Sequence, residues 1–286
     1  METENREVTK KENTFSRRNF AEKIGLAGIG MAGAVWLGDH AAALGLTPQV
    51  DAQSITDADI LNFALNLEYL EAEFYTRVTT GKTIEEIGIP VSGTGTPGPT
   101  RGGNQVNFCV GRYWLDERQA RITMEIAEQL AYDEQQHVIL LRNALGNYAV
   151  AKPAINLDAL GFGFGNYREY LQLARAFEDV GVSAYGGAAP LVSSKAYLQV
   201  AAQILATEAL HSGDIRKQVQ GFDIQTFPVD SLDVLPPPSG KHFFTVNAQA
   251  LAVIRTTSQV LSIVYGGGTA KGGFFPNGMN GVITSA

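Results

Sequence analysis

The pattern Glu-x-x-His occurs twice in this chain and is the feature best suited to chemistry. The two copies are Glu134–His137 and Glu208–His211, each within a long segment that has the pattern of a helix. Residues three apart on a helix lie on the same face. A glutamate and a histidine at this spacing can therefore bind one metal ion together.

A second pattern, also present twice, places a tyrosine seven residues after a glutamate. It occurs as Glu68–Tyr75 and as Glu178–Tyr185, on two further helical segments. Two helices that each give one inward glutamate, and two that each give Glu-x-x-His, provide the ligands of a dinuclear carboxylate-bridged metal site in a four-helix bundle. The sequence therefore predicts metal chemistry.

The charges of these residues support the same interpretation. An ionised carboxylate in an apolar core is costly unless it is paired or coordinated. Two divalent cations would balance the four negative charges of Glu68, Glu134, Glu178 and Glu208, with His137 and His211 as neutral ligands. Oxygen and nitrogen ligands favour iron or manganese and also accept zinc, and Cys109, the only cysteine, excludes a thiolate cluster.

Several roles stay open at this point. Glu71 lies on the same face as Glu68 and could replace it as a ligand, support a histidine, or remain a protonated acid. We favour Glu68 because its spacing to Tyr75 is repeated in Glu178 and Tyr185. The two tyrosines are better explained as hydrogen-bond partners of ligand carboxylates than as radical sites. The alternative to a metal site is a hydrogen-bonded polar core.

Helical periodicity and capping residues predict the elements that position these side chains. The first helix is expected to begin at Thr56 or Asp57, with Thr56 and Asp59 as a capping pair, and to reach about Val78 before Gly81. A loop rich in glycine and proline follows over 88–103. Further helices are expected over about 113–145, 167–185, 194–220 and 247–265, and the helix over 167–185 is expected to break at Gly186 and Gly187.

The N-terminus has the composition of an export signal. Arg17 and Arg18 precede an apolar, glycine-rich run over 24–37 and the small residues 41–43, as in a bacterial twin-arginine signal. We expect a periplasmic, cell-envelope or extracellular protein, and no stable membrane span after signal cleavage. The net charge of −7 argues against a nucleic-acid partner. The expected domains are the signal and linker (1–45), a four-helix bundle (52–222) and a C-terminal extension packed on it (223–286).

Four segments resemble the ferritin-like domain proteins: 61–75 (LNFALNLEYLEAEFY), 131–146, 176–192 and 204–216. The tail segments 255–266 and 272–281 resemble, more narrowly, the branch of exported bacterial ferritin-like proteins and plant desiccation-related proteins. The resemblance implies an all-α four-helix bundle with a long insert between its first two helices and one further helix in the extension. It also implies a di-iron or di-manganese centre held by Glu68, Glu134, His137, Glu178, Glu208 and His211.

Three functions fit these ligands. The first is redox chemistry on dioxygen or peroxide, of the ferroxidase, peroxidase or catalase type. The second is a non-catalytic stress or desiccation protein, and the third is a protein that sequesters metal. Storage ferritins are shorter chains that form hollow cages, so the insert and the extension argue against a mineral-filled cage. The sequence leaves open whether the chain forms a homo-oligomer.

Overall fold

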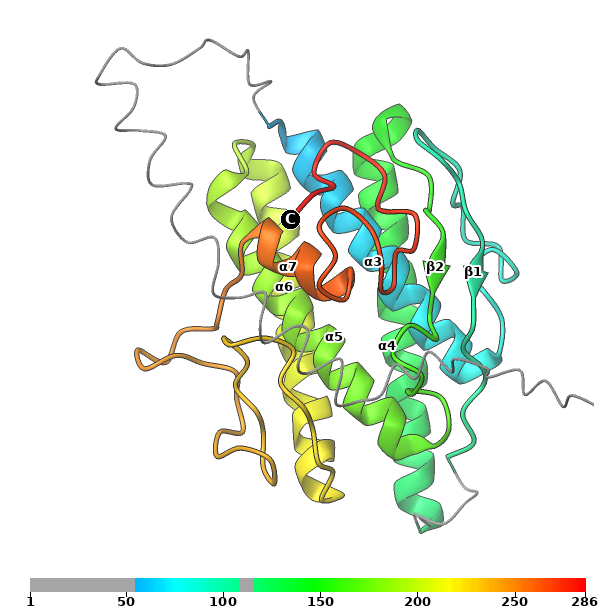
Figure 1. Cartoon of the computed structure of the whole chain (residues 1–286), viewed down its shortest axis with the longest axis vertical. Helices are drawn as coiled ribbons and strands as arrows, with labels where there is room; N and C mark the ends of the chain where they lie inside the picture. Colours follow the sequence, from blue (N-terminus) through cyan, green and yellow to red (C-terminus); the bar gives the residue numbers. More distant parts are fainter. Residues whose placement is uncertain (1–54, 109–115) are drawn as a thin grey trace, which may run out of the picture.

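Four long helices make up most of the molecule. The computed structural model describes residues 55–108 and 116–286 (Figure 1). The predicted export signal and Cys109 lie outside these residues. The elements, in chain order, are α3 (Asp57–Thr80), β1 (Thr100–Arg101), α4 (Glu117–Leu145), η1 (Gly146–Tyr148), β2 (Ile155–Asn156), α5 (Tyr167–Ala188), η2 (Ala189–Leu191), α6 (Lys195–Gly221) and α7 (Thr257–Val264).

The helices begin and end where their capping residues allow. Thr56 and Asp59 form the predicted capping box at the start of α3, and Gly81 ends that helix in the left-handed conformation. Ser194 caps α6, close to its expected start. The first visible turn of α4 is capped by Asp116, a few residues after the predicted start. These caps satisfy the free backbone groups at the helix ends and so set where each helix begins or ends.

Two predicted boundaries are wrong. The predicted end of the third helix is wrong, since α5 continues through Gly186 and Gly187 to Ala188. At these glycines the helix packs against the extension. A side-chain carbon at Gly187 would lie 2.0 Å from the carbonyl oxygen of Arg255, so glycine allows this close approach rather than ending the helix. The tail helix is shorter than predicted, because residues 247–252 form a turn in which the Asn247 side chain accepts hydrogen bonds from the backbone.

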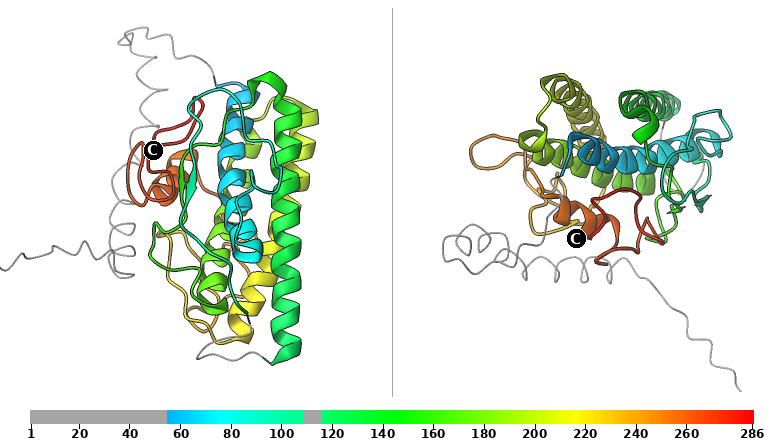
Figure 2. Two further views of the ribbon diagram at one scale, coloured as in Figure 1. Left: turned by 90° about the vertical axis from the view of Figure 1, so that its right-hand side faces the viewer. Right: turned by 90° about the horizontal axis from the view of Figure 1, so that it is seen from above.

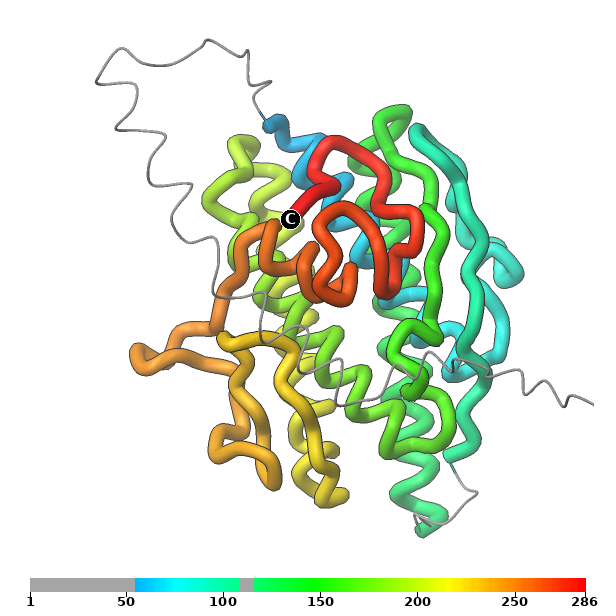
Figure 3. The backbone as a smooth tube through the Cα atoms, viewed as in Figure 1, coloured from blue at the N-terminus to red at the C-terminus, as the bar shows by residue number. Residues whose placement is uncertain are grey.

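The elements form three layers, visible in both views of Figure 2. Helices α4 and α6 form the outer layer of the bundle, and α3 and α5 form the middle layer. The C-terminal extension, here residues 223–286, covers the other side of α3 and α5 (Figure 3). Helix α3 packs along α4 and α5 along α6, while α7 contacts α5. The arrangement is the all-α bundle that the sequence predicts, whereas the exact domain boundaries stay a prediction.

The insert between α3 and α4 is held along the side of the bundle. Strand β1 pairs in parallel with β2, and Thr94 forms an isolated bridge with Val150. The buried ammonium of Lys152 donates to the hydroxyl of Thr100 (2.8 Å) and lies 3.2 Å from a carboxylate oxygen of Glu73 on α3. This segment is therefore anchored to the bundle by a buried charge pair.

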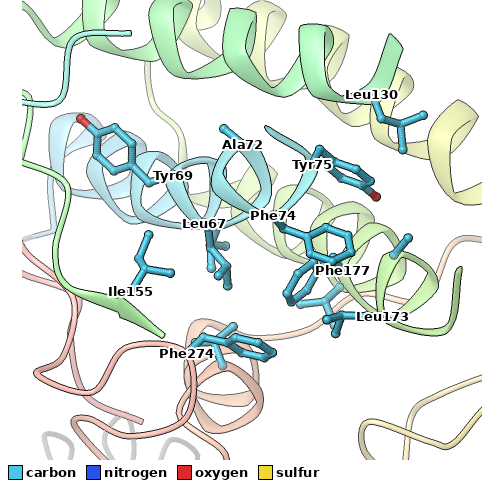
Figure 4. Packing of buried hydrophobic residues seen from close by; sticks show 14 of the residues in the cluster. Leu67, Tyr69, Ala72, Phe74, Tyr75, Leu130, Ile155, Leu173, Phe177 and Phe274 are labelled. Carbon is cyan, nitrogen blue, oxygen red and sulfur yellow. The ribbon is translucent and has the colours of Figure 1, made fainter. Parts of the chain in front are cut away.

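Aromatic packing fills the space between α3 and α5. Phe74 lies at the centre of this group, with its ring centroid 5.0 Å from that of Phe177 and 5.5 Å from that of Phe164. Figure 4 shows Phe177 and Phe274 on the side of α3 that faces the extension. The hydroxyl of Tyr75 instead donates to Glu178 on α5, inside the bundle. Helix α3 thus presents an apolar face to the extension and a more polar face to the bundle interior. Among the described residues, no helix is both long and apolar enough to cross a membrane.

Candidate metal centre

Six of the predicted ligand residues meet at the centre of the bundle. Each of the four long helices contributes, and the glutamates are fully buried, while each histidine is 7% exposed. The six are Glu68 on α3, Glu134 and His137 on α4, Glu178 on α5, and Glu208 and His211 on α6. Their spacing along each helix places them on its inward face, as the periodicity predicts. The structure thus brings together residues up to 143 positions apart in the sequence (211 − 68).

The donor atoms divide into two overlapping sets of four. One set contains Glu68 and His137, the other contains Glu178 and His211, and both include Glu134 and Glu208. Within each set the donor atoms lie within 4.8 Å of one another. Each set therefore offers one imidazole nitrogen and three carboxylate oxygens to a metal ion. The shared residues are the glutamates of the two Glu-x-x-His patterns.

Glu134 has the orientation of a bridging carboxylate. Its Oε2 lies 3.1 Å from Nδ1 of His137, and its Oε1 lies 3.0 Å from Nδ1 of His211. The two oxygens of one side chain thus face the two different histidines. Glu208 completes the first set, with its Oε1 3.4 Å from Nδ1 of His137.

Unpartnered atoms test whether these residues fit a pair of metal ions. Both carboxylate oxygens of Glu208, one oxygen each of Glu68, Glu134 and Glu178, and Nδ1 of His211 find no hydrogen-bond partner among the described residues. Of the nitrogen–oxygen contacts within the cluster, only that between Nδ1 of His137 and Oε2 of Glu134 is a hydrogen bond. The other short nitrogen–oxygen separations of the cluster lack hydrogen-bond geometry. Buried polar atoms are rarely left unbonded, so the cluster needs a partner of another kind. Oxygen and imidazole donors suit iron, manganese or zinc, and the chemistry of the residues fits such ions.

The protonation of the cluster leads to the same conclusion. Burial raises the pKa of Glu134 to about 7, although the two histidines that face its oxygens lower it. Burial, together with the charge of Glu134, raises the pKa of Glu208 well above its usual range. Burial alone would lower the pKa of His211, but the carboxylates of Glu134 and Glu178 that face its Nδ1 raise it to about 12. Without metal, the cluster can hold its excess negative charge only by retaining protons.

The two tyrosines bond to ligand carboxylates in a crossed arrangement. The hydroxyl of Tyr75 on α3 donates to Glu178 on α5, and that of Tyr185 on α5 donates to Glu68 on α3. Burial, followed by the nearby carboxylate charge, raises the pKa of each phenol well above its ordinary value. Both tyrosines therefore keep their protons and fix the orientation of a carboxylate, which is the role that the sequence analysis favours.

Glu71 lies beside the cluster but belongs to neither donor set. It is buried, and its pKa is raised well above the usual range by burial and by the negative charge of Glu208 and its neighbours. Of the three roles that the sequence leaves open, this environment favours the protonated acid.

Sequence reasoning missed Asp133. Its Oδ2 lies 3.1 Å from Nε2 of His211, the ring nitrogen opposite the one that faces the carboxylates. A carboxylate in this position fixes the tautomer and the orientation of a ligand histidine. The sequence offered one signal for this role, because Asp133 directly precedes the predicted ligand Glu134. At that position the side chain of Asp133 reaches His211 on the neighbouring helix α6.

Comparison with known proteins agrees with this geometry. The model of a family described as "Ferritin-like domain" matches residues 56–221. Ferritin-like catalase Nec2 of Nesocodon mauritianus is 24% identical over 286 aligned positions, which cover 82% of this chain and 87% of that protein. Desiccation-related protein PCC13-62 of Craterostigma plantagineum is 28% identical over 178 positions, which cover 56% of this chain and 52% of that protein.

These matches confirm the resemblance inferred from the sequence. The family model covers more than half of the chain and spans the four long helices that carry the candidate ligands. The chain belongs to the ferritin-like domain family.

Proposed function

We propose that this protein is an oxidoreductase that holds two iron or manganese ions and breaks down peroxide in a catalase-type reaction. The observation that carries the proposal is the pair of overlapping donor sets, whose buried carboxylate oxygens have no other partner among the described residues. The relative named a ferritin-like catalase favours peroxide over the other oxidants.

A bound pair of such ions would supply two electrons to one hydrogen peroxide and regain two from the next, so that two peroxides yield two waters and one dioxygen. Glu68 and His137 would hold one ion and Glu178 and His211 the other, with Glu134 and Glu208 shared. Tyr75 and Tyr185 would keep the two unshared carboxylates in place.

The surrounding residues would hold protons and limit access of water. Glu71 would keep a proton on its carboxyl group close to Glu208, where the formation of water from peroxide requires one. The helices around the cluster bury every candidate carboxylate. A dry site of this kind strengthens the interactions of charged groups within it.

The test is metal content and peroxide turnover in matched variants. We expect the purified protein to hold about two ions per chain and to release dioxygen from hydrogen peroxide. Glu134→Ala and His211→Ala should lose both properties. Glu128→Ala, at an exposed position on α4, the helix of Glu134, should keep them. Full activity in Glu134→Ala would refute the proposed centre.

A second candidate is a stress or desiccation protein in which the metal is only structural, favoured by the relative named a desiccation-related protein. In that case, a chelator would lower the melting temperature of the loaded protein by mass action, with no turnover to lose. Reversible loading without turnover and without a change in melting temperature would instead indicate metal sequestration.

We also propose export by the twin-arginine route, supported by Arg17, Arg18 and the apolar run that follows them. Replacement of both arginines by lysine should leave the protein inside bacterial cells. Unchanged export of that variant, measured by cell fractionation, would refute this route.

A further inference from the structure

A small cavity lies between the middle layer of the bundle and the C-terminal extension. Its volume is about 50 Å³. Helix α3 contributes Leu70 and helix α5 contributes Phe177, while Val264 and Phe274 of the extension close the opposite side. Figure 4 shows Phe177 and Phe274 on this side of α3. The extension therefore forms the outer wall of the cavity.

The inner end of the cavity reaches the candidate metal centre. Glu71 and Gly181 both line the cavity. A side-chain carbon at Gly181 would lie 2.6 Å from Oε2 of Glu208 and 3.3 Å from Oε1 of Glu71. The glycine thus allows a shared carboxylate of the cluster to approach the backbone of α5 beside the cavity. Any larger residue at this position would collide with that carboxylate.

Other lining residues extend toward the surface. Phe227 is 42% exposed, and Gln172 and Ala176 on α5 are half-buried. The cavity therefore connects residues that contact solvent with Glu71, which is 5% exposed. The insert at 88–103, a natural candidate for a lid, contributes none of the described lining residues.

The size and polarity of the cavity define its occupant. One water needs about 10–15 Å³ by the same measure, and pockets for drug-sized molecules have about 300–1,000 Å³, so this cavity suits only a few heavy atoms. Apart from Glu71, two polar atoms of its mostly apolar lining residues, Nε of Arg175 and Oε1 of Gln172, are buried without a partner among the described residues. One is a donor and the other an acceptor, which suits a small uncharged molecule that both donates and accepts hydrogen bonds.

We propose that this cavity is the entry chamber for hydrogen peroxide, and that the C-terminal extension makes the site selective against peroxides that carry an alkyl group. Hydrogen peroxide has the required size, lacks charge, and both donates and accepts hydrogen bonds. This inference rests on the proposed function, because it assigns a substrate path to the same centre.

Ala176→Leu tests the path by narrowing the cavity at a half-buried position that can accept a larger side chain. In metal-loaded protein, kcat/KM for hydrogen peroxide should fall by at least about tenfold, with kcat less affected and metal content unchanged. Ala188→Leu is the matched control, because Ala188 is also a half-buried alanine on α5 but does not line the cavity. Equal kcat/KM in the two variants would overturn the inference.

Phe274→Ala tests selectivity by enlarging the cavity instead of narrowing it. It also provides a second test of the inference if Ala176→Leu fails to fold. The wild type should turn over tert-butyl hydroperoxide at least about tenfold more slowly than hydrogen peroxide, and Phe274→Ala should reduce that difference. An unchanged ratio would contradict a selective role of the extension.

A readout independent of activity is xenon binding in crystals under pressure. Xenon should bind in the cavity of the wild type and of Ala188→Leu, and should be absent from Ala176→Leu. No xenon in the wild-type cavity, or equal occupancy in all three proteins, would overturn the inference. Loaded wild type that shows no peroxide turnover would refute the proposed function, and peroxide as the occupant with it, whereas turnover that Ala176→Leu leaves unchanged would refute the entry chamber alone.

Discussion

Two buried charged clusters lie close together on α5 and α6 and differ in their balance of charge. The candidate metal centre contains four glutamates and two histidines. The second cluster, the arginine network, consists of Arg175, Asp179, Arg216 and Asp233. Glu178 of the first cluster and Asp179 of the second are neighbours in the sequence, but their side chains lie on different faces of α5.

The carboxylates of the arginine network are fully satisfied by donors within the described residues. Its two arginines balance its two aspartates, and Arg216 donates to Oδ2 of Asp179 at 2.6 Å while Arg175 donates to Oδ2 of Asp233 at 2.7 Å. The remaining oxygen of Asp179 accepts a hydrogen bond from Ser212. Every carboxylate oxygen in this network has a donor, whereas five carboxylate oxygens of the metal centre have none among the described residues. Burial of charge therefore does not identify a site, but imbalance of charge does.

The comparison predicts that the two clusters affect the stability of the metal-free protein in opposite directions. Asp233→Ala leaves Arg175 buried with an incomplete set of partners and should lower the free energy of unfolding by about 3–5 kcal/mol. Metal content per folded chain should stay unchanged, because Asp233 lies outside both donor sets. Denaturant unfolding of metal-free protein measures the first effect and elemental analysis the second. A decrease of less than about 1 kcal/mol in the free energy of unfolding would mean that the Arg175–Asp233 pair is as weak as an exposed ion pair.

Glu208→Gln should have the opposite sign in the metal-free protein. It replaces a buried carboxyl, both of whose oxygens are unpartnered among the described residues, with a neutral group of the same shape. Unfolding free energy at pH 7 should rise by about 1–3 kcal/mol, since a site selected for function costs stability. The variant should no longer hold two ions. Glu128→Gln, exposed on α4, is the control and should change stability by less than about 0.5 kcal/mol. A destabilised Glu208→Gln would instead indicate a hydrogen-bonded polar core without metal.

The two clusters also differ in how far the sequence predicts them. The ligands of the metal centre repeat at helical spacing, so the faces of their helices follow from local periodicity, and with them most of the fold. The arginine network depends on Asp233, which reaches α5 only because the extension folds back over the bundle. No local sequence pattern predicts that the extension folds back over the bundle. The cavity could not be predicted for the same reason, because Phe274 and Val264 of the extension form its outer wall.

Smaller misses have the same origin. Gly186 and Gly187 have the pattern of a helix end, but the extension packs so closely on them that α5 continues. Asp133 had no visible partner in the sequence, since His211 follows 78 residues later on another helix. Glu71 could not be separated from Glu68 by spacing alone, and only the position of the other carboxylates distinguishes them.

Asp133→Asn tests whether a residue at the edge of the metal centre supports metal binding through His211. The substitution keeps the size of the side chain but weakens the charged hydrogen bond that orients His211. Affinity for the metal should fall by about 10–100-fold, measured by competition with a chelator of known affinity. Asp214→Asn is a suitable control, because Asp214 on α6 accepts a hydrogen bond from Gln218 and belongs to neither donor set. Equal affinity in the two variants would reduce Asp133 to a surface residue.

The last prediction concerns the protons that metal binding releases. In the metal-free protein, the pKa of Glu134 is about 7, that of Glu208 lies well above its usual range, and that of His211 is about 12. These groups hold protons at neutral pH, and a metal ion must displace them, so affinity should rise with pH by about tenfold per unit for each proton released. Above pH 7 Glu134 is already ionised, so the slope should be steeper below pH 7 than above it. Calorimetric titration with manganese in buffers of different ionisation enthalpy counts the protons directly. An affinity that is constant between pH 6 and 8 would mean that the cluster tolerates its own negative charge without protons, and the contrast with the arginine network would then no longer explain why metal binds there.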